Sequence, residues 1–130
     1  MSETVSADAT ADISVIIPIY RAAATINRAL ASVAAQTVTP REVIIVDDGS
    51  DDGTFEIAQA WSSRLGKTKL IVLQEEHRGA GATRNKAVSK ASCEFVAFLD
   101  ADDEWLPQKL EKSLAVLNET KSEIVSHNYI

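Results

Sequence analysis

The stretch that decides the fold is Phe95-Val96-Ala97-Phe98-Leu99-Asp100-Ala101-Asp102-Asp103, in which an apolar run ends in three carboxylates. Such a run is typical of a strand that is buried on both faces of a parallel sheet. A second run, Val43-Ile44-Ile45-Val46, ends in Asp47-Asp48-Gly49-Ser50-Asp51-Asp52. Carboxylates at the end of a buried strand are costly unless a cation meets them. The two clusters therefore predict a divalent cation, an anionic ligand bridged by that cation, or both.

Further apolar runs indicate a repeating pattern of strands and helices. The expected strands are 13–19, 42–46, 69–73, 95–99 and a fifth that begins at 124–126. Between them, apolar residues recur at helical spacing, which predicts helices with a core-facing stripe. These stripes run over residues 26–34, 57–65, 80–91 and 106–117. The alternation predicts an α/β fold, a Rossmann-like sandwich of strands and helices around a mainly parallel sheet.

Composition limits the class of protein. The 130 residues suffice for one domain, and the net charge of −6 without a basic stripe excludes a general nucleic-acid binder. No apolar stretch reaches about 18 residues, so no membrane span is expected. Residues 1–12 lack an apolar segment and are expected to form a disordered tail before a domain of residues 13–130. Cys93, the only cysteine, lies beside a buried run and is expected to be a core thiol.

The polar motifs share one position, because each follows an expected strand at its carboxyl end. The motifs are Tyr20-Arg21, Asp47 to Ser50, His77-Arg78-Gly79 and Asp100 to Asp103. Open α/β sheets bind ligands along this edge. Aspartates at strand ends also cap helices, which explains Asp51, Asp52 or Asp103 more easily than it explains the paired carboxylates. His77 and His127 have no partners at metal-ligand spacing and are expected at the surface.

Two local patterns partly resemble the motifs of a calcium-binding loop and of a dinucleotide-binding turn. The segment Asp48 to Gly53 resembles half of an EF-hand loop, but its twelfth position is Gln59 and a strand precedes it, so we reject that site. Gly79-Ala80-Gly81-Ala82-Thr83-Arg84 begins like a dinucleotide fingerprint, but it follows the third strand, and Arg84 replaces the third glycine. Either Arg84 reaches a phosphate from this turn, or it faces solvent.

Two families share this order of motifs. A response-regulator receiver also has an acidic pair after one strand and an aspartate after another, but its acidic pair belongs to its first strand. The chain resembles more fully the N-terminal, nucleotide-binding portion of a family 2 glycosyltransferase with the GT-A fold. The matching blocks, in order, are 14–20, 32–37, 42–54, Gly79 to Ala87 and 98–103.

The resemblance implies a nucleotide site. Tyr20 would pack against the nucleobase, Asp48 would accept a hydrogen bond from a base N–H, and Pro18 would shape that loop through its backbone. Arg84 would lie near the diphosphate or the base. The implied donor is a nucleotide-diphospho-sugar, with a UDP-sugar as the expected one.

The resemblance also implies a metal site. Asp100 and Asp102 match the family's DXD motif, in which Asp100 lies near the ribose and the metal, and Asp102 ligates Mn²⁺ or Mg²⁺. Asp103 would be a further ligand or a carboxylate just outside the ligand shell. A divalent ion neutralises the leaving nucleoside diphosphate, and family members invert the anomeric centre with the help of an acidic base. That base lies well beyond the DXD motif in the family, so it is expected beyond Ile130.

Several expectations concern the protein's setting. The acceptor would be a saccharide or a lipid-linked saccharide, in polysaccharide synthesis in the cytoplasm or at the inner face of the membrane. The chain alone is expected to bind the donor weakly and to transfer little sugar. Exposed sheet edges favour a homodimer. A non-catalytic nucleotide-binding module is the alternative class.

Overall fold

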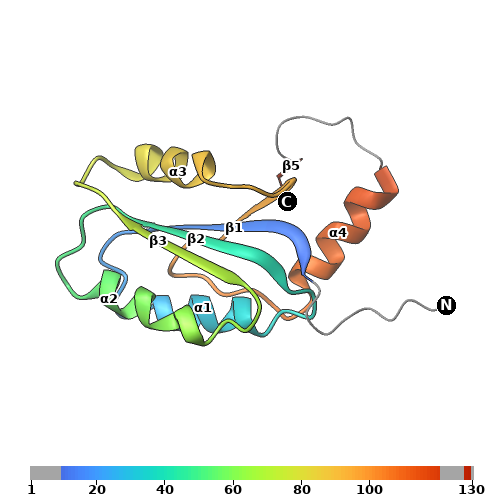
Figure 1. Ribbon diagram of the computed structural model, residues 1–130, viewed down its shortest axis with the longest axis horizontal. Coiled ribbons are helices and arrows are strands. Elements are labelled where there is room, and N and C mark those ends of the chain that lie inside the picture. The colour runs from blue at the N-terminus through green and yellow to red at the C-terminus, as the bar shows by residue number, and fades with distance from the viewer. Residues whose placement is uncertain (1–9, 121–127, 130) are drawn as a thin grey trace.

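Strands and helices alternate along the chain in the computed structural model, which describes residues 10–120 and 128–129 (Figure 1). The elements are β1 (Ala11–Ile19), α1 (Ile26–Ala34), β2 (Pro40–Asp47), α2 (Thr54–Gln59), the 3₁₀ helix η1 (Ala60–Ser63), β3 (Lys69–Gln74), α3 (Ala80–Ser89), β4 (Phe95–Phe98), α4 (Lys109–Thr120) and β5 (Asn128–Tyr129). Neighbouring strands in the sheet are parallel. The predicted α/β fold with a mainly parallel sheet is therefore confirmed.

The order of the strands separates the two families that the motifs suggested. The sheet has the order β3-β2-β1-β4-β5, so that β1 lies between β2 and β4. A receiver has the order 2-1-3-4-5, in which the first strand lies between the second and the third. The observed order excludes the receiver. It also places a topological switch point between β1 and β4, where open α/β sheets form a ligand crevice.

The alternation of side chains along β1 supplies both faces of the sheet with a core. Val15 and Ile17 pack with residues of α1, α2 and η1, whereas Ile16 packs with Ala87 of α3. Figure 1 shows α1 and α2 on one face of the sheet and α3 on the other. Since apolar side chains cover β1 on both sides, its near-continuous apolar sequence is what this position requires.

The last described helix begins later than its apolar stripe predicted. Leu106 was expected to face the core, but it lies before α4 and is 78% exposed. The side chain of Gln36 explains the difference. Its Nε2 donates to the Leu106 carbonyl at 2.7 Å, and its Oε1 accepts from the Leu110 amide at 3.0 Å. Gln36 thereby caps α4 from a distant part of the chain and leaves the segment before it irregular.

Two expectations reach beyond the described residues. Of the expected tail, residues 1–9 lie outside them, whereas Ala11 and Asp12 belong to β1, so this strand begins two residues before the expected 13. Asp12 Oδ1 accepts from Arg41 Nη1 at 2.9 Å. The expected strand start at 124–126 also lies outside the described residues.

Other sequence expectations concern single side chains and helices. Trp61, which falls within the core-facing stripe expected over residues 57–65, is in the core and only 4% exposed, and Cys93 is 2% exposed. Burial raises the pKa of the Cys93 thiol, which fits the predicted core thiol. Among the described helices, none combines the length and the apolar character that crossing a membrane requires.

Gly49 occupies a position where a larger residue is expected to destabilise the fold. Its φ is +84°, and a Cβ there would lie 3.0 Å from the His77 nitrogen and 3.2 Å from the Glu75 carbonyl oxygen. We expect Gly49→Ala to lower the free energy of unfolding by about 1–3 kcal/mol, measured by urea denaturation. Gly81→Ala is the control, because a Cβ on Gly81 meets nothing within 4 Å. A similar loss in both variants would contradict this account of Gly49.

Candidate nucleotide and metal site

An open cleft of about 620 Å³ lies at the carboxyl ends of β1, β2 and β4, beside the start of α3. It brings together six residues that the sequence singled out, from four separate segments. These residues are Pro18, Tyr20, Asp48, Arg84, Asp100 and Asp102. A second groove, of about 720 Å³, runs along α4 and contains none of them. The cleft is therefore the candidate site.

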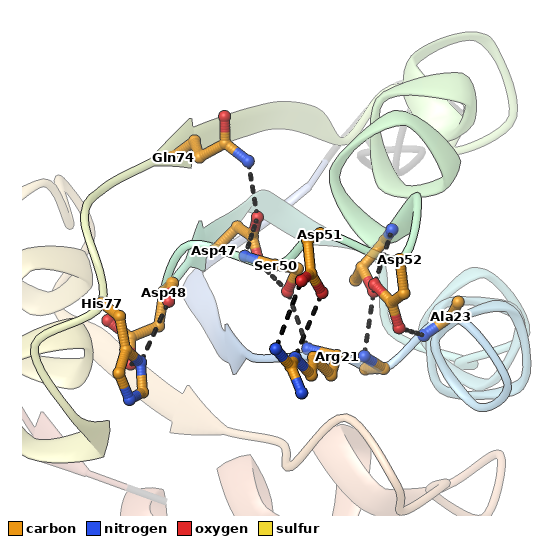
Figure 2. Close-up of polar contacts among 11 residues, drawn as sticks. Arg21, Ala23, Asp47, Asp48, Ser50, Asp51, Asp52, Gln74 and His77 are labelled. Atoms are coloured by element: carbon orange, nitrogen blue, oxygen red, sulfur yellow. Dashed lines mark hydrogen bonds and ion pairs between the residues drawn. The ribbon is translucent and has the colours of Figure 1, made fainter.

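Asp47 holds the loop after β2 in place and does not line the cleft. Its carboxylate is fully buried and accepts hydrogen bonds from the Ser50 amide at 3.2 Å, the Ser50 hydroxyl and Gln74 Nε2 at 2.9 Å. Figure 2 shows these contacts, which close the turn after β2 and tie it to the end of β3. Of the two adjacent carboxylates Asp47 and Asp48, only Asp48 lines the cleft.

Asp48 is a buried carboxylate with fixed donors. Oδ1 accepts from the Arg78 amide at 2.7 Å, and Oδ2 accepts from the Gly79 amide at 3.0 Å. His77 Nδ1 lies 2.8 Å from Oδ2. Burial alone raises the pKa of Asp48, but the amides of Arg78 and Gly79 outweigh it, so the pKa falls below the ordinary 3.8. Asp48 is therefore an ionised acceptor at neutral pH.

The lowered pKa of Asp48 predicts a pH dependence of stability. The carboxylate titrates at a lower pH in the folded protein than in the unfolded chain, whose ordinary pKa is 3.8. Its contribution is therefore complete at a pH well above that value and is lost as the pH falls through the folded pKa. We expect Asp48→Asn to be less stable than the wild type at pH 7, with a difference that shrinks by pH 3.

Urea denaturation from about pH 7 to pH 3 measures this difference. Asp51→Asn serves as the control, because the Asp51 side chain is 72% exposed. A difference between Asp48→Asn and the wild type that stays constant over this range would contradict the lowered pKa.

Tyr20 and His77 form an aromatic pair beside Asp48. Their ring centroids lie 4.5 Å apart with an angle of 26° between the planes, and Arg21 Cζ lies 5.2 Å from the Tyr20 centroid. The His77 side chain is 60% exposed, as expected for a surface residue, but the sequence analysis missed its two partners at the site. The signal was its position after the third strand, at the same sheet edge as Asp48.

Asp51 and Asp52 hold the segment after β1. Asp51 pairs with the guanidinium of Arg21 at 3.2 Å, and Asp52 accepts from the Ala23 amide at 3.4 Å (Figure 2). Asp52 also accepts from the amide and hydroxyl of Thr54, and that hydroxyl is the main cause of its lowered pKa. Asp52 thus binds the first residue of α2, but the expectation that it caps the helix is wrong, because the N-cap is Gly53 and no side chain forms the cap hydrogen bond.

Asp100, Asp102 and Asp103 form an exposed acidic cluster. The Asp103 amide donates to the Asp100 carbonyl at 3.0 Å, which folds the segment into a tight turn. One carboxylate oxygen from each residue lies within 4.8 Å of the others. Adjacent ligands of an octahedral Mg²⁺ lie about 3 Å apart and opposite ligands about 4.2 Å apart, so the three oxygens would move closer together to share one ion. The oxygen donors fit Mg²⁺ or Mn²⁺.

Two arginines contact this turn. Arg84 Nη2 lies 3.9 Å from Asp100 Oδ1, and its guanidinium lies 5.0 Å from the Phe98 ring centroid. Arg28 of α1 donates from Nη2 to the Asp102 carbonyl at 3.3 Å, and its Nε lies 3.3 Å from Glu104 Oε1. The sequence analysis missed Arg28, because 74 residues separate it from Asp102 and no local pattern links them.

Comparisons with known proteins agree with this geometry. Residues 14–130 match the sequence model of the family described as Glycosyl transferase family 2. TuaG of Bacillus subtilis, named as a glycosyltransferase of teichuronic acid biosynthesis, is 43% identical over 82% of the chain. The structure of Staphylococcus aureus TarS in complex with UDP is 36% identical over 85% of the chain, with a TM-score of 0.76.

A third relative binds a different nucleotide. The mannosyltransferase PcManGT from Pyrobaculum calidifontis, solved with GDP-Man and Mn²⁺, is 31% identical over 84% of the chain, with a TM-score of 0.76. The chain spans 42% of TuaG and 33% of each of these two solved chains. The fold is of the GT-A type that these structural neighbours share. From its sequence, fold and cleft, the chain belongs to glycosyl transferase family 2.

Proposed function

We propose that this chain is the donor-binding portion of an enzyme that transfers a sugar from a nucleotide-diphospho-sugar to an acceptor hydroxyl. The observation that carries the proposal is the convergence of Asp48, Arg84 and the DXD residues Asp100 and Asp102 on one cleft at the switch point of the sheet. Support comes from the structural relatives, one solved with UDP and one with GDP-Man and Mn²⁺.

At the diphosphate end of the cleft, Asp102 and Asp100 would hold Mn²⁺ or Mg²⁺, with Asp103 as a further ligand or a neighbouring carboxylate. The ion would neutralise the charge that grows on the leaving nucleoside diphosphate. Arg84 adds a second positive charge here, since its guanidinium already lies 3.9 Å from Asp100. When a diphosphate enters, Arg84 can exchange this carboxylate for a phosphate oxygen.

At the base end, Asp48, Tyr20 and Pro18 would receive the nucleobase. Because Asp48 is ionised, it offers acceptors only, so the base must supply an N–H. Uracil and guanine have such a group on the ring, at N3 and N1, whereas cytosine and adenine present a bare ring nitrogen there. We propose a UDP-sugar as the donor. Support comes from TarS, which was solved with UDP and is 36% identical to the chain, against 31% for PcManGT, which was solved with GDP-Man.

The transfer step needs residues outside this chain. We propose that transfer inverts the anomeric centre and that the acidic base which deprotonates the acceptor belongs to the part of family members that the chain does not span. The acceptor would be a saccharide or a lipid-linked saccharide. The chain by itself is then expected to bind the donor without efficient transfer, and rapid metal-dependent transfer by it would refute this division of labour.

Equilibrium dialysis with labelled UDP-glucose, UDP-GlcNAc and GDP-mannose tests the proposal. Each sugar nucleotide is measured with Mn²⁺ and with EDTA, and pyrophosphate with Mn²⁺ controls for binding of the diphosphate alone. We expect a UDP-sugar to bind in Mn²⁺, to bind more weakly in EDTA and to bind more tightly than pyrophosphate. The proposal fails if no sugar nucleotide binds better than pyrophosphate.

A further inference from the structure

We propose that Arg28 positions the turn of residues 100–103 for metal binding, through the hydrogen bond from its guanidinium to the Asp102 carbonyl. This inference rests on the proposed function, in which the turn holds the ion that bridges the diphosphate. It goes further by assigning a role to a residue of α1 that lies outside the family's matching blocks and does not line the cleft. Arg28 acts through the turn, so it is a positioning residue and not a metal ligand.

The contact reaches the turn at the peptide group that joins two of its carboxylate residues. The carbonyl of this group, from Asp102, accepts from Arg28 Nη2 at 3.3 Å. The amide of the same group, from Asp103, donates to the Asp100 carbonyl at 3.0 Å. Because a peptide group is planar, these two hydrogen bonds restrain the directions in which both flanking side chains leave the backbone. Arg28 thus holds one side of the peptide group between Asp102 and Asp103.

Such a restraint matters because negative charge is concentrated in the turn. Asp100, Asp102 and Asp103 are exposed, and one carboxylate oxygen from each lies within 4.8 Å of the others. Like charges at this separation repel each other, and the three oxygens would move closer still to share one ion. A backbone that is already restrained loses fewer conformations when the ion binds, and this strengthens binding. We therefore expect the metal affinity to depend on the contact with Arg28.

The two arginines at the turn have different partners, and this separates their roles. Arg84 lines the cleft and lies 3.9 Å from Asp100 Oδ1, a carboxylate that a phosphate oxygen can replace. Arg28 bonds a main-chain oxygen, and its Nε lies 3.3 Å from Glu104 Oε1, outside the cleft. A nucleotide in the cleft would not compete for these partners. The contact of Arg28 with the turn is therefore expected to persist while the ion is bound.

Charge and position predict opposite effects of removing Arg28. By Coulomb's law alone, a cation beside the turn disfavours Mn²⁺, so its removal would strengthen metal binding. A positioning role predicts weaker metal binding, because groups that hold metal ligands in place commonly contribute about 10- to 100-fold to metal affinity. We expect the lower end of this range, because the Arg28 side chain is 55% exposed. The sign of the change therefore distinguishes the two effects.

The experiment measures the dissociation constant of UDP by calorimetry in EDTA and in Mn²⁺. The ratio of the first constant to the second gives the metal-dependent part of binding. Arg28→Met keeps an unbranched side chain and removes every donor, whereas Arg28→Lys keeps a charge and a donor. Arg41→Met is the matched control, because the Arg41 side chain is 51% exposed and pairs with Asp12. All three variants are expected to fold, since exposed ion pairs contribute little to stability.

We expect Arg28→Met to lower this ratio by about 10-fold, Arg28→Lys to recover part of it, and Arg41→Met to leave it at the wild-type value. An unchanged or higher ratio in Arg28→Met overturns the inference, as does an equal loss in Arg41→Met or no recovery in Arg28→Lys. These results leave the proposed function intact. Wild-type binding of UDP that does not depend on Mn²⁺ removes the metal site and this inference together, whereas no binding at all overturns the proposed function as well.

Discussion

Asp102→Asn is expected to weaken Mn²⁺-dependent UDP binding by about 100-fold or more. Asp102 lies in the cleft and in the three-carboxylate cluster, so the substitution removes a negative charge and an oxygen ligand from the proposed metal site. Loss of a group that only supports a metal ligand commonly lowers metal affinity by 10- to 100-fold, and a direct ligand is expected to matter at least as much. Calorimetric titration of UDP in Mn²⁺ measures the change.

The control for this variant removes a carboxylate elsewhere on the sheet. Asp12 belongs to the amino end of β1 and pairs with Arg41, on the edge opposite the cleft. Asp12→Asn should bind UDP as the wild type does, in Mn²⁺ and in EDTA. In EDTA, Asp102→Asn should differ little from the wild type. An Asp102→Asn variant that retains wild-type affinity in Mn²⁺ would remove Asp102 from the metal site.

Asp47→Ala is expected to lower the free energy of unfolding by about 3 kcal/mol. The Asp47 carboxylate is fully buried and accepts from the amide and hydroxyl of Ser50 and from Gln74 Nε2. Alanine leaves these donors without a partner and opens a small cavity, and both effects destabilise the folded state. Thermal or urea denaturation measures the loss.

The neighbouring Asp51 provides a matched comparison. Its side chain is 72% exposed, and exposed ion pairs contribute at most about 1 kcal/mol. Asp51→Ala should therefore change stability by a few tenths of a kcal/mol. If Asp47→Ala were as mild as Asp51→Ala, the loop after β2 would not depend on the buried carboxylate. Because Asp47 precedes Asp48, its loss should also weaken nucleotide binding.

The alternating strands and helices of the fold could be predicted from the sequence. Val43 to Val46 and Phe95 to Phe98 lie in strands of a parallel sheet because apolar residues face both layers, and such runs are visible without a structure. The meeting of Asp48, Arg84 and Asp102 at one cleft followed from a topological rule, since the carboxyl ends of parallel strands share one edge. The roles of these residues in binding remain predictions.

Contacts between segments that are far apart in the chain could not be predicted from the sequence. Gln36 moves the start of α4 to Lys109 by bonding the backbone on both sides of that helix start. Arg28 reaches the Asp102 carbonyl across 74 residues, and His77 reaches Asp48 across 29. Each depends on the distance between elements once they are packed, which periodicity along one segment does not encode.

Paramagnetic broadening of backbone amide signals by Mn²⁺ in the presence of UDP tests the central claim most directly, because it locates the ion. Mg²⁺ with UDP provides the diamagnetic reference. The account predicts that broadening is centred on residues 100–103 and reaches the start of α3, where Arg84 lies beside Asp100. Broadening centred on Asp47 to Asp52, or no broadening that depends on UDP, would contradict a nucleotide-bound metal at the DXD turn.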